Sequence, residues 1–143
     1  MRPRRARCRR CRTTHVLLPA SCLPRASVTV DIVGAALLAN ADGVSHRAIA
    51  ARLDLPADTV RGWLRRATVH APWLRRQATT LAYQLEPGLP PMPPHRTVLG
   101  DALTALGTAA GAAVRRLGML APPWQLISMI TGGRLLGPAA RAD

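Results

Sequence analysis

The stretch SHRAIAARLDLPADTVRGWLRR, residues 45–66, predicts a helix, a tight turn and a second helix. Ser45 is placed to cap the first helix, because its hydroxyl can accept a hydrogen bond from a backbone N–H of the first turn. Ile49, Ala50 and Leu53 recur at helical spacing and give this helix one apolar face. Because Ala50 is small, we expect the two short helices to cross closely there.

The second helix is predicted to begin at Pro56, whose fixed φ suits a first helical turn and whose missing N–H costs nothing there. Asp58 complements the positive end of the helix dipole. The buried face is predicted to consist of Val60, Trp63 and Leu64.

With those residues inward, a second set points outward and includes two arginines one turn apart. An arginine fork can bind guanine O6 and N7 in the major groove of DNA. We therefore expect base contacts from Asp58, Arg61 and Arg65 and phosphate contacts from Ser45, His46, Arg47 and Arg66. Gly62, in the same helix, would let the backbone approach DNA closely. The alternative is a helical hairpin whose basic face is merely solvated.

The stretch resembles the helix-turn-helix of bacterial regulators and transposase-type proteins. The residues that carry the resemblance are Ile49, Ala50, Leu53, Leu55, Thr59, Val60, Arg61 and Trp63. The departure is Asp54, which stands where such turns commonly hold glycine. Aspartate tolerates the left-handed conformation better than most residues, so the turn is expected to form.

The charge of the chain points to a polyanionic partner. Arginine accounts for all 20 basic residues against 7 acidic ones, and the formal net charge is +13. Residues 1–76 hold 15 of the arginines and 4 of the acids, so the excess lies in the half that contains the helix-turn-helix. Nucleic acid, as double-stranded DNA, fits this distribution better than a membrane surface.

Catalytic motifs are missing from the sequence. The acidic residues are few and scattered, and there is no Gly-rich phosphate loop, Ser/His/Asp grouping or H-E-x-x-H motif. We expect a protein that is not an enzyme and that needs no cofactor, zinc being the one open question.

That question concerns the first 26 residues. Residues 1–12 hold seven arginines and are expected either to start the chain as a disordered segment or to lie as a basic arm along phosphates or the minor groove. The candidate zinc ligands are Cys8, Cys11, His15 and Cys22. Their spacing fits no standard ribbon, so reduced cysteines that bind no metal are the favoured alternative.

The run CRRCRTTHVLLP resembles the second half of the zinc ribbons that precede helix-turn-helix domains in an uncharacterised actinobacterial, mobile-element-like family. The resemblance implies a further C-x-x-C upstream of the present Met1. It also implies that this chain holds only a partial zinc ribbon.

The predicted fold class is all-α: a three-helix helix-turn-helix core, added C-terminal helices and a disordered or irregular basic N-terminus with at most a short strand. Further helices are expected at residues 28–41, with Val30, Val33, Leu37 and Leu38 on one face, and at 72–85 and 97–118. Residues 122–136 are expected to hold one short helix that ends near Gly132 and Gly133. Pro72 is expected to kink or interrupt the helix before 72–85. The predicted segments are a basic Cys-containing segment 1–26, a DNA-binding domain 27–86, a Pro-rich linker 87–96 and a helical segment 97–143.

Residues 97–118 carry a helix-pairing seam of Leu99, Leu103, Leu106, Ala110, Ala113 and Leu117. Its partner is predicted to be a second copy of the chain, giving a homodimer, or residues 72–85 of the same chain. Gly107 and Gly111 have the spacing of a membrane-helix motif, but the charges at Asp101, Arg115 and Arg116 argue against a membrane span.

The sequence thus predicts a sequence-specific DNA-binding protein, cytoplasmic and associated with the nucleoid, that acts as a transcriptional regulator or with a mobile element. The alternative is a helical interaction module that the arginine-rich N-terminus tethers to any nucleic acid.

Overall fold

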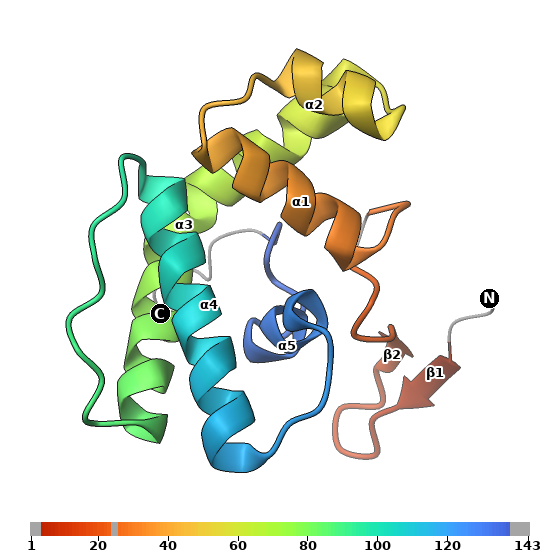
Figure 1. Cartoon of the computed structure of the whole chain (residues 1–143). Helices are drawn as coiled ribbons and strands as arrows, with labels where there is room; N and C mark the ends of the chain where they lie inside the picture. The colour runs from red at the N-terminus through yellow and green to blue at the C-terminus, as the bar shows by residue number, and fades with distance from the viewer. Residues whose placement is uncertain (1–3, 24–25, 138–143) are drawn as a thin grey trace.

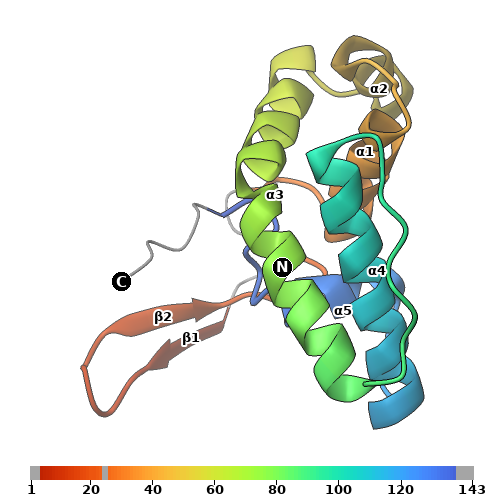
Figure 2. The ribbon, with the colours of Figure 1, turned by 90° about the vertical axis from the view of Figure 1, so that its left-hand side faces the viewer.

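The long helix α3, Ala57–Leu85, is the element against which α1, α2 and α4 all pack. The structure is a computed structural model that describes residues 4–23 and 26–137. Figure 2 shows α3 running the length of the molecule, with α1, α2 and α4 on one side of it. The other helices are α1 Val30–Ala41, α2 His46–Leu53, α4 Val98–Leu117 and α5 Pro123–Ile130. The all-α prediction is confirmed.

The N-terminal segment differs from the prediction of an irregular or disordered start. Strand β1, Arg4–Arg7, pairs antiparallel with β2, Thr14–Leu17, and places Arg4 opposite Leu17. This two-stranded hairpin projects from the helical body (Figures 1 and 2). The arginine run suggested charge repulsion, whereas backbone pairing with residues 14–17 holds its first part, Arg4–Arg7, in a strand. The short strand that the sequence allowed is therefore present, and it is paired.

Helix α3 passes through Pro72 without interruption, so the predicted separate helix at 72–85 is wrong. Proline in a helix interior removes one backbone hydrogen bond and costs about 3 kcal/mol. Pro72 is exposed, and Ala71 and Leu74 beside it are fully buried. Tertiary packing of the apolar face therefore keeps the helix continuous across the proline.

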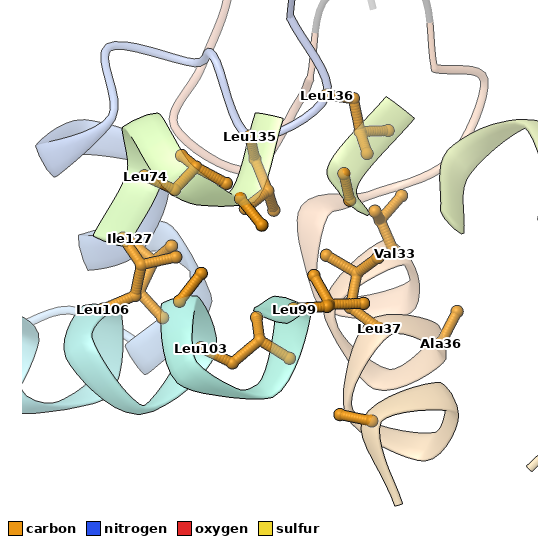
Figure 3. Close-up of a cluster of buried hydrophobic side chains, with 14 of the residues drawn as sticks. Val33, Ala36, Leu37, Leu74, Leu99, Leu103, Leu106, Ile127, Leu135 and Leu136 are labelled. Atoms are coloured by element: carbon orange, nitrogen blue, oxygen red, sulfur yellow. The ribbon is translucent and has the colours of Figure 1, made fainter. Parts of the chain in front are cut away.

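Helix α4 packs along the C-terminal half of α3 (Figure 1). Of the two partners predicted for residues 97–118, the structure shows the one within the same chain. The seam residues from Leu99 to Ala113 are buried within the same chain, and Leu117 is exposed. One hydrophobic cluster joins α1, α3, α4, α5 and the segment after α5. Figure 3 shows Leu74, Leu103, Leu106 and Ile127 meeting in this cluster. The predicted segments 27–86 and 97–143 thus share one core.

No helix of the described residues is both long enough and apolar enough to cross a bilayer. In α4, Asp101 lies in the first turn and Arg115 and Arg116 lie in the last. These charges restrict the apolar part of the helix, as the sequence indicated.

The prediction for α1 needs correction, whereas the prediction for α5 is confirmed. Helix α1 begins at Val30 rather than residue 28, and Leu38, expected on its buried face, is 47% exposed, whereas Val33 and Leu37 are fully buried. Helix α5 ends at Ile130, just before two glycines with positive φ, Gly132 and Gly133, as the sequence predicted.

Candidate nucleic-acid interface

The N-terminus of α2 is built as the sequence predicts. The Ser45 hydroxyl accepts a hydrogen bond from the Ala48 N–H at 3.3 Å and so satisfies one of the free donors of the first turn. The preceding turn is held by the Asn40 side chain, whose Nδ2 donates to the Val44 carbonyl at 3.1 Å. Gly43, with φ of 96°, provides the positive φ that this turn requires. The first turn of α2 is therefore fixed relative to the end of α1.

The turn between α2 and α3 depends on Asp54. This residue has φ of 53° and ψ of 48°, which is the left-handed conformation. The next residue, Leu55, donates its N–H to the Ala50 carbonyl at 3.0 Å and packs partly buried against the core. The expected tolerance of aspartate at a position usually held by glycine is confirmed.

Buried side chains hold α2 and α3 crosswise. Trp63 and Ile49 are each 2% exposed, and Val60 is completely buried. Leu53 packs half-buried at the edge of the same core. Burial of a tryptophan together with aliphatic side chains contributes several kcal/mol, so the angle between the two helices is set by these contacts.

The opposite face of α3 is open to solvent. Asp58, Arg61, Arg65 and Arg66 are all exposed, as predicted. In residues 4–23 and 26–137 the arginines that form ion pairs are Arg75, Arg115 and Arg116. The guanidinium groups of the first turns of α3 therefore have no carboxylate partner within the described chain.

An open hollow of about 350 Å³ lies between α3, α2 and the end of α1. His46, Arg61 and Arg65 line it, so the structure brings together one predicted phosphate-binding residue and two predicted base-reading residues. Leu64 and Val69 add apolar surface to the same hollow. The site therefore offers positive charge, hydrogen-bond donors and a small apolar area side by side.

The remaining predicted site residues do not line this hollow. Ser45 and Arg47 are exposed at the start of α2, and Asp58 and Arg66 are exposed on α3. The hollow also includes Asn40, Thr68 and Val69, which the sequence did not single out. Helical periodicity offered a signal for Thr68 and Val69, because they follow Leu64 and Arg65 by one turn. Nothing comparable pointed to Asn40, which lies on a different helix.

Arg75 has a different environment from the arginines at the start of α3. Its guanidinium lies 3.5 Å from a carboxylate oxygen of Asp101 on α4. The pair links the two long helices. A DNA contact by Arg75 would compete with this ion pair.

The predicted zinc ligands are only partly described. Cys8 and Cys22 are half-buried and Cys11 is exposed, while the side chain of His15 lies outside the described part of the chain. Among the side chains that are described, no group of three or more His, Cys, Asp or Glu residues could hold a metal ion. A structural zinc site needs four ligands. Zinc binding thus stays a prediction.

Comparison with known families agrees with this geometry. The family model of the homeodomain-like domain matches residues 27–68, which span α1, α2 and the first part of α3. The match supports DNA binding by a helix-turn-helix. No curated protein and no solved structure gives a significant match to the chain.

Proposed function

We propose that this chain binds double-stranded DNA sequence-specifically by placing the first turns of α3 in the major groove. The observation that carries the proposal is the contrast between the two sides of α3: Trp63 is 2% exposed, whereas Arg61 and Arg65 are exposed and line one hollow. A helix of this kind, set crosswise on a shorter one, fits the width of the major groove.

In this proposal the residues divide into two groups. Arg61, Arg65 and Asp58 contact base edges, and each good arginine–guanine pair supplies about 1–3 kcal/mol of discrimination. Phosphate contacts come from Ser45, His46, Arg47 and Arg66, supported by the free N–H groups at the start of α2. The phosphate contacts fix the orientation of the domain, and the base contacts select the sequence.

We further propose a role without catalysis, as a transcriptional regulator or as a DNA-binding protein of a mobile element, in the cytoplasm at the nucleoid. Support comes from the homeodomain-like match over residues 27–68 and from the scarcity of acidic residues, 7 in the whole chain. A homodimer, if one forms through residues 97–118, would have to use the outer residues of α4, such as Val98, Val114 and Leu117.

The test begins with selection of preferred duplexes from a random pool by the full chain. Arg61→Ala and Arg65→Ala are then compared with Arg66→Ala on the selected duplex and on random DNA. We expect the first two to lose about 1–3 kcal/mol on the selected duplex and to relax its sequence preference. Arg66→Ala should weaken binding to both duplexes alike.

A matched control is Arg96→Ala, an exposed arginine in the segment between α3 and α4. It removes the same charge outside the helix-turn-helix and should leave sequence preference unchanged. Equal losses on selected and random DNA for Arg61→Ala, Arg65→Ala and Arg66→Ala would contradict base reading and favour non-specific tethering.

A further inference from the structure

The hairpin of β1 and β2 carries the densest positive charge of the described chain. Six arginines lie between residues 4 and 12, all of them exposed, and no acidic residue occurs before residue 31. The ion pairs within residues 4–23 and 26–137 all involve arginines of α3 and α4. The hairpin therefore presents a charge that the described chain does not neutralise.

The turn of the hairpin gathers part of this charge around one hollow. Arg7, Arg9 and Arg12, together with Cys8, line an open space of about 310 Å³. The Arg7 Nε donates to the Arg12 carbonyl at 3.1 Å, which fixes the start of the Arg7 guanidinium across the turn. Arginines that line one open space can bind an anion such as a phosphate group through charge-assisted hydrogen bonds.

The turn itself is ordered by backbone hydrogen bonds. The Cys8 N–H donates to the Thr13 carbonyl, and the Arg12 N–H donates to the Cys8 carbonyl, each at 2.9 Å. Arg12 adopts a left-handed conformation with φ of 58°. These bonds and this φ bring Arg12 back beside Arg7.

In both views the hairpin lies towards the lower end of the molecule, whereas α2 and the start of α3 lie at the upper end (Figures 1 and 2). A contact by the hairpin would therefore fall on the duplex beyond the stretch that the first turns of α3 read.

We propose that the hairpin is a second DNA-contacting element, whose arginine hollow binds backbone phosphates of the duplex beside the site that α3 reads. This inference rests on the proposed function, because it assumes that α3 binds the same duplex. The hairpin itself is proposed to contact phosphates and no bases. Its expected contribution is affinity, salt dependence and a longer footprint, with sequence preference left to α3.

The test compares two variants of the full chain that lose the same charge. The hairpin variant is Arg7→Gln/Arg9→Gln/Arg12→Gln. The control is Arg96→Gln/Arg115→Gln/Arg116→Gln, in α4 and the segment before it. Glutamine keeps a long polar side chain and allows Arg12 to be replaced without adding strain at its positive φ. Circular dichroism confirms that both variants are folded.

Binding is measured over a range of salt on the selected duplex at two lengths: about one helical turn, and the same site with about ten base pairs added on each side. Each neutralised phosphate contributes about 0.9 to the slope of log K against log salt. Loss of three contacts should therefore lower the magnitude of this slope by about 2 to 3 on the long duplex. At about 0.15 M salt the affinity should fall about tenfold or more. The short duplex should show a much smaller loss, and backbone protection in the added flanks should disappear.

The outcomes separate this inference from the proposed function. The hairpin contact is contradicted if the hairpin variant binds the long duplex as tightly as the control does and protects the same flanks. This conclusion does not depend on the DNA binding of Arg61→Ala and Arg65→Ala. The wild-type chain could instead show no sequence preference while its affinity and flank protection still depend on the hairpin arginines. That result would contradict base reading by α3 and would support the hairpin contact.

Discussion

His46, in the first turn of α2, and Arg61, in α3, line the same open hollow. The turn at Asp54 and the burial of Trp63 bring these two side chains together from separate helices. One of them is a predicted phosphate ligand and the other a predicted base ligand. Because the two side chains lie close together, a helix-turn-helix can make its phosphate contacts and its base contacts at the same time.

Gly62 lies among the arginines on the outer part of α3, and a Cβ added to it would meet no atom of the chain within 4 Å. Gly62→Ala is expected to stabilise the fold by about 1 kcal/mol, because alanine is the better helix former. If the backbone approaches DNA closely at this position, the same change should weaken binding several-fold. Thermal unfolding and binding to the selected duplex measure the two effects separately. A variant that is more stable and binds unchanged would show that DNA does not approach the Gly62 backbone.

Gly34 on α1 packs directly against the indole ring of Trp124 on α5, and an added Cβ would overlap the ring. Gly34→Ala should therefore lower the free energy of unfolding by about 1–3 kcal/mol, as overpacking of a core contact does. Gly107→Ala on α4 is the matched control, since a Cβ there meets no atom within 4 Å. The control should be neutral or stabilising in chemical denaturation. Equal effects of the two changes would mean that α1 and α5 do not pack as described.

His70 on α3 is 1% exposed, and both of its ring nitrogens are without a hydrogen-bond partner among the described residues. Its ring stacks on Trp73 with centroids 4.6 Å apart. Burial, and to a lesser extent the positive charge of Arg134, lowers the pKa of His70 from its ordinary value of 6.5. The neutral ring is thus the form that the folded chain accommodates.

Because the pKa of His70 is lower in the folded chain, the unfolded chain binds more protons as the pH falls. The stabilising effect of the neutral ring is complete above pH 6.5 and is lost progressively as the pH falls from there towards the lowered pKa. The free energy of unfolding should fall by up to about 1.4 kcal/mol per pH unit in that window. Urea denaturation between about pH 7 and pH 5 measures this slope. The slope should flatten in His70→Leu, and an unchanged slope in that variant would exclude His70 as its source.

Local features of residues 45–66 were enough to predict the helix-turn-helix. The cap at Ser45, the left-handed Asp54 and the inward Trp63 each depend on neighbours within a few residues, and the structure confirms each of them. The exposed arginines then follow from helical periodicity. The roles assigned to them at DNA stay predictions.

The structural features that could not be predicted from the sequence depend on contacts between distant segments. The helix through Pro72 survives because α4 covers its buried face, and no local pattern reveals that α4 lies there. The hairpin forms because residues 14–17 pair with the arginine run, and neither strand alone carries a strong strand signal. Asn40 joins the hollow through the turn between α1 and α2, which brings it near Arg61 only in three dimensions.

The alternative function, a helical interaction module, cannot be tested by deletion of the C-terminal segment, because that segment shares one hydrophobic core with α3. Deletion of residues 97–143 would uncover Leu74, Ala78 and Ala82 on α3, which are fully buried in the intact chain. A truncated chain would thus lose stability together with any assembly function. Substitutions at exposed residues of α4, such as Leu117→Ser, are expected to leave the fold intact and to abolish pairing only if α4 pairs with another copy. Sedimentation of the full chain measures this directly.

The most direct measurement of the central claim is methylation protection on the selected duplex. Dimethyl sulfate methylates guanine N7 in the major groove and adenine N3 in the minor groove, and an arginine fork bound to guanine covers N7. The account predicts that the wild-type chain protects guanines at the selected site and that Arg61→Ala or Arg65→Ala each restores methylation at one of them. Guanines that remain reactive under the bound protein, with protection confined to adenine N3, would contradict the placement of α3 in the major groove.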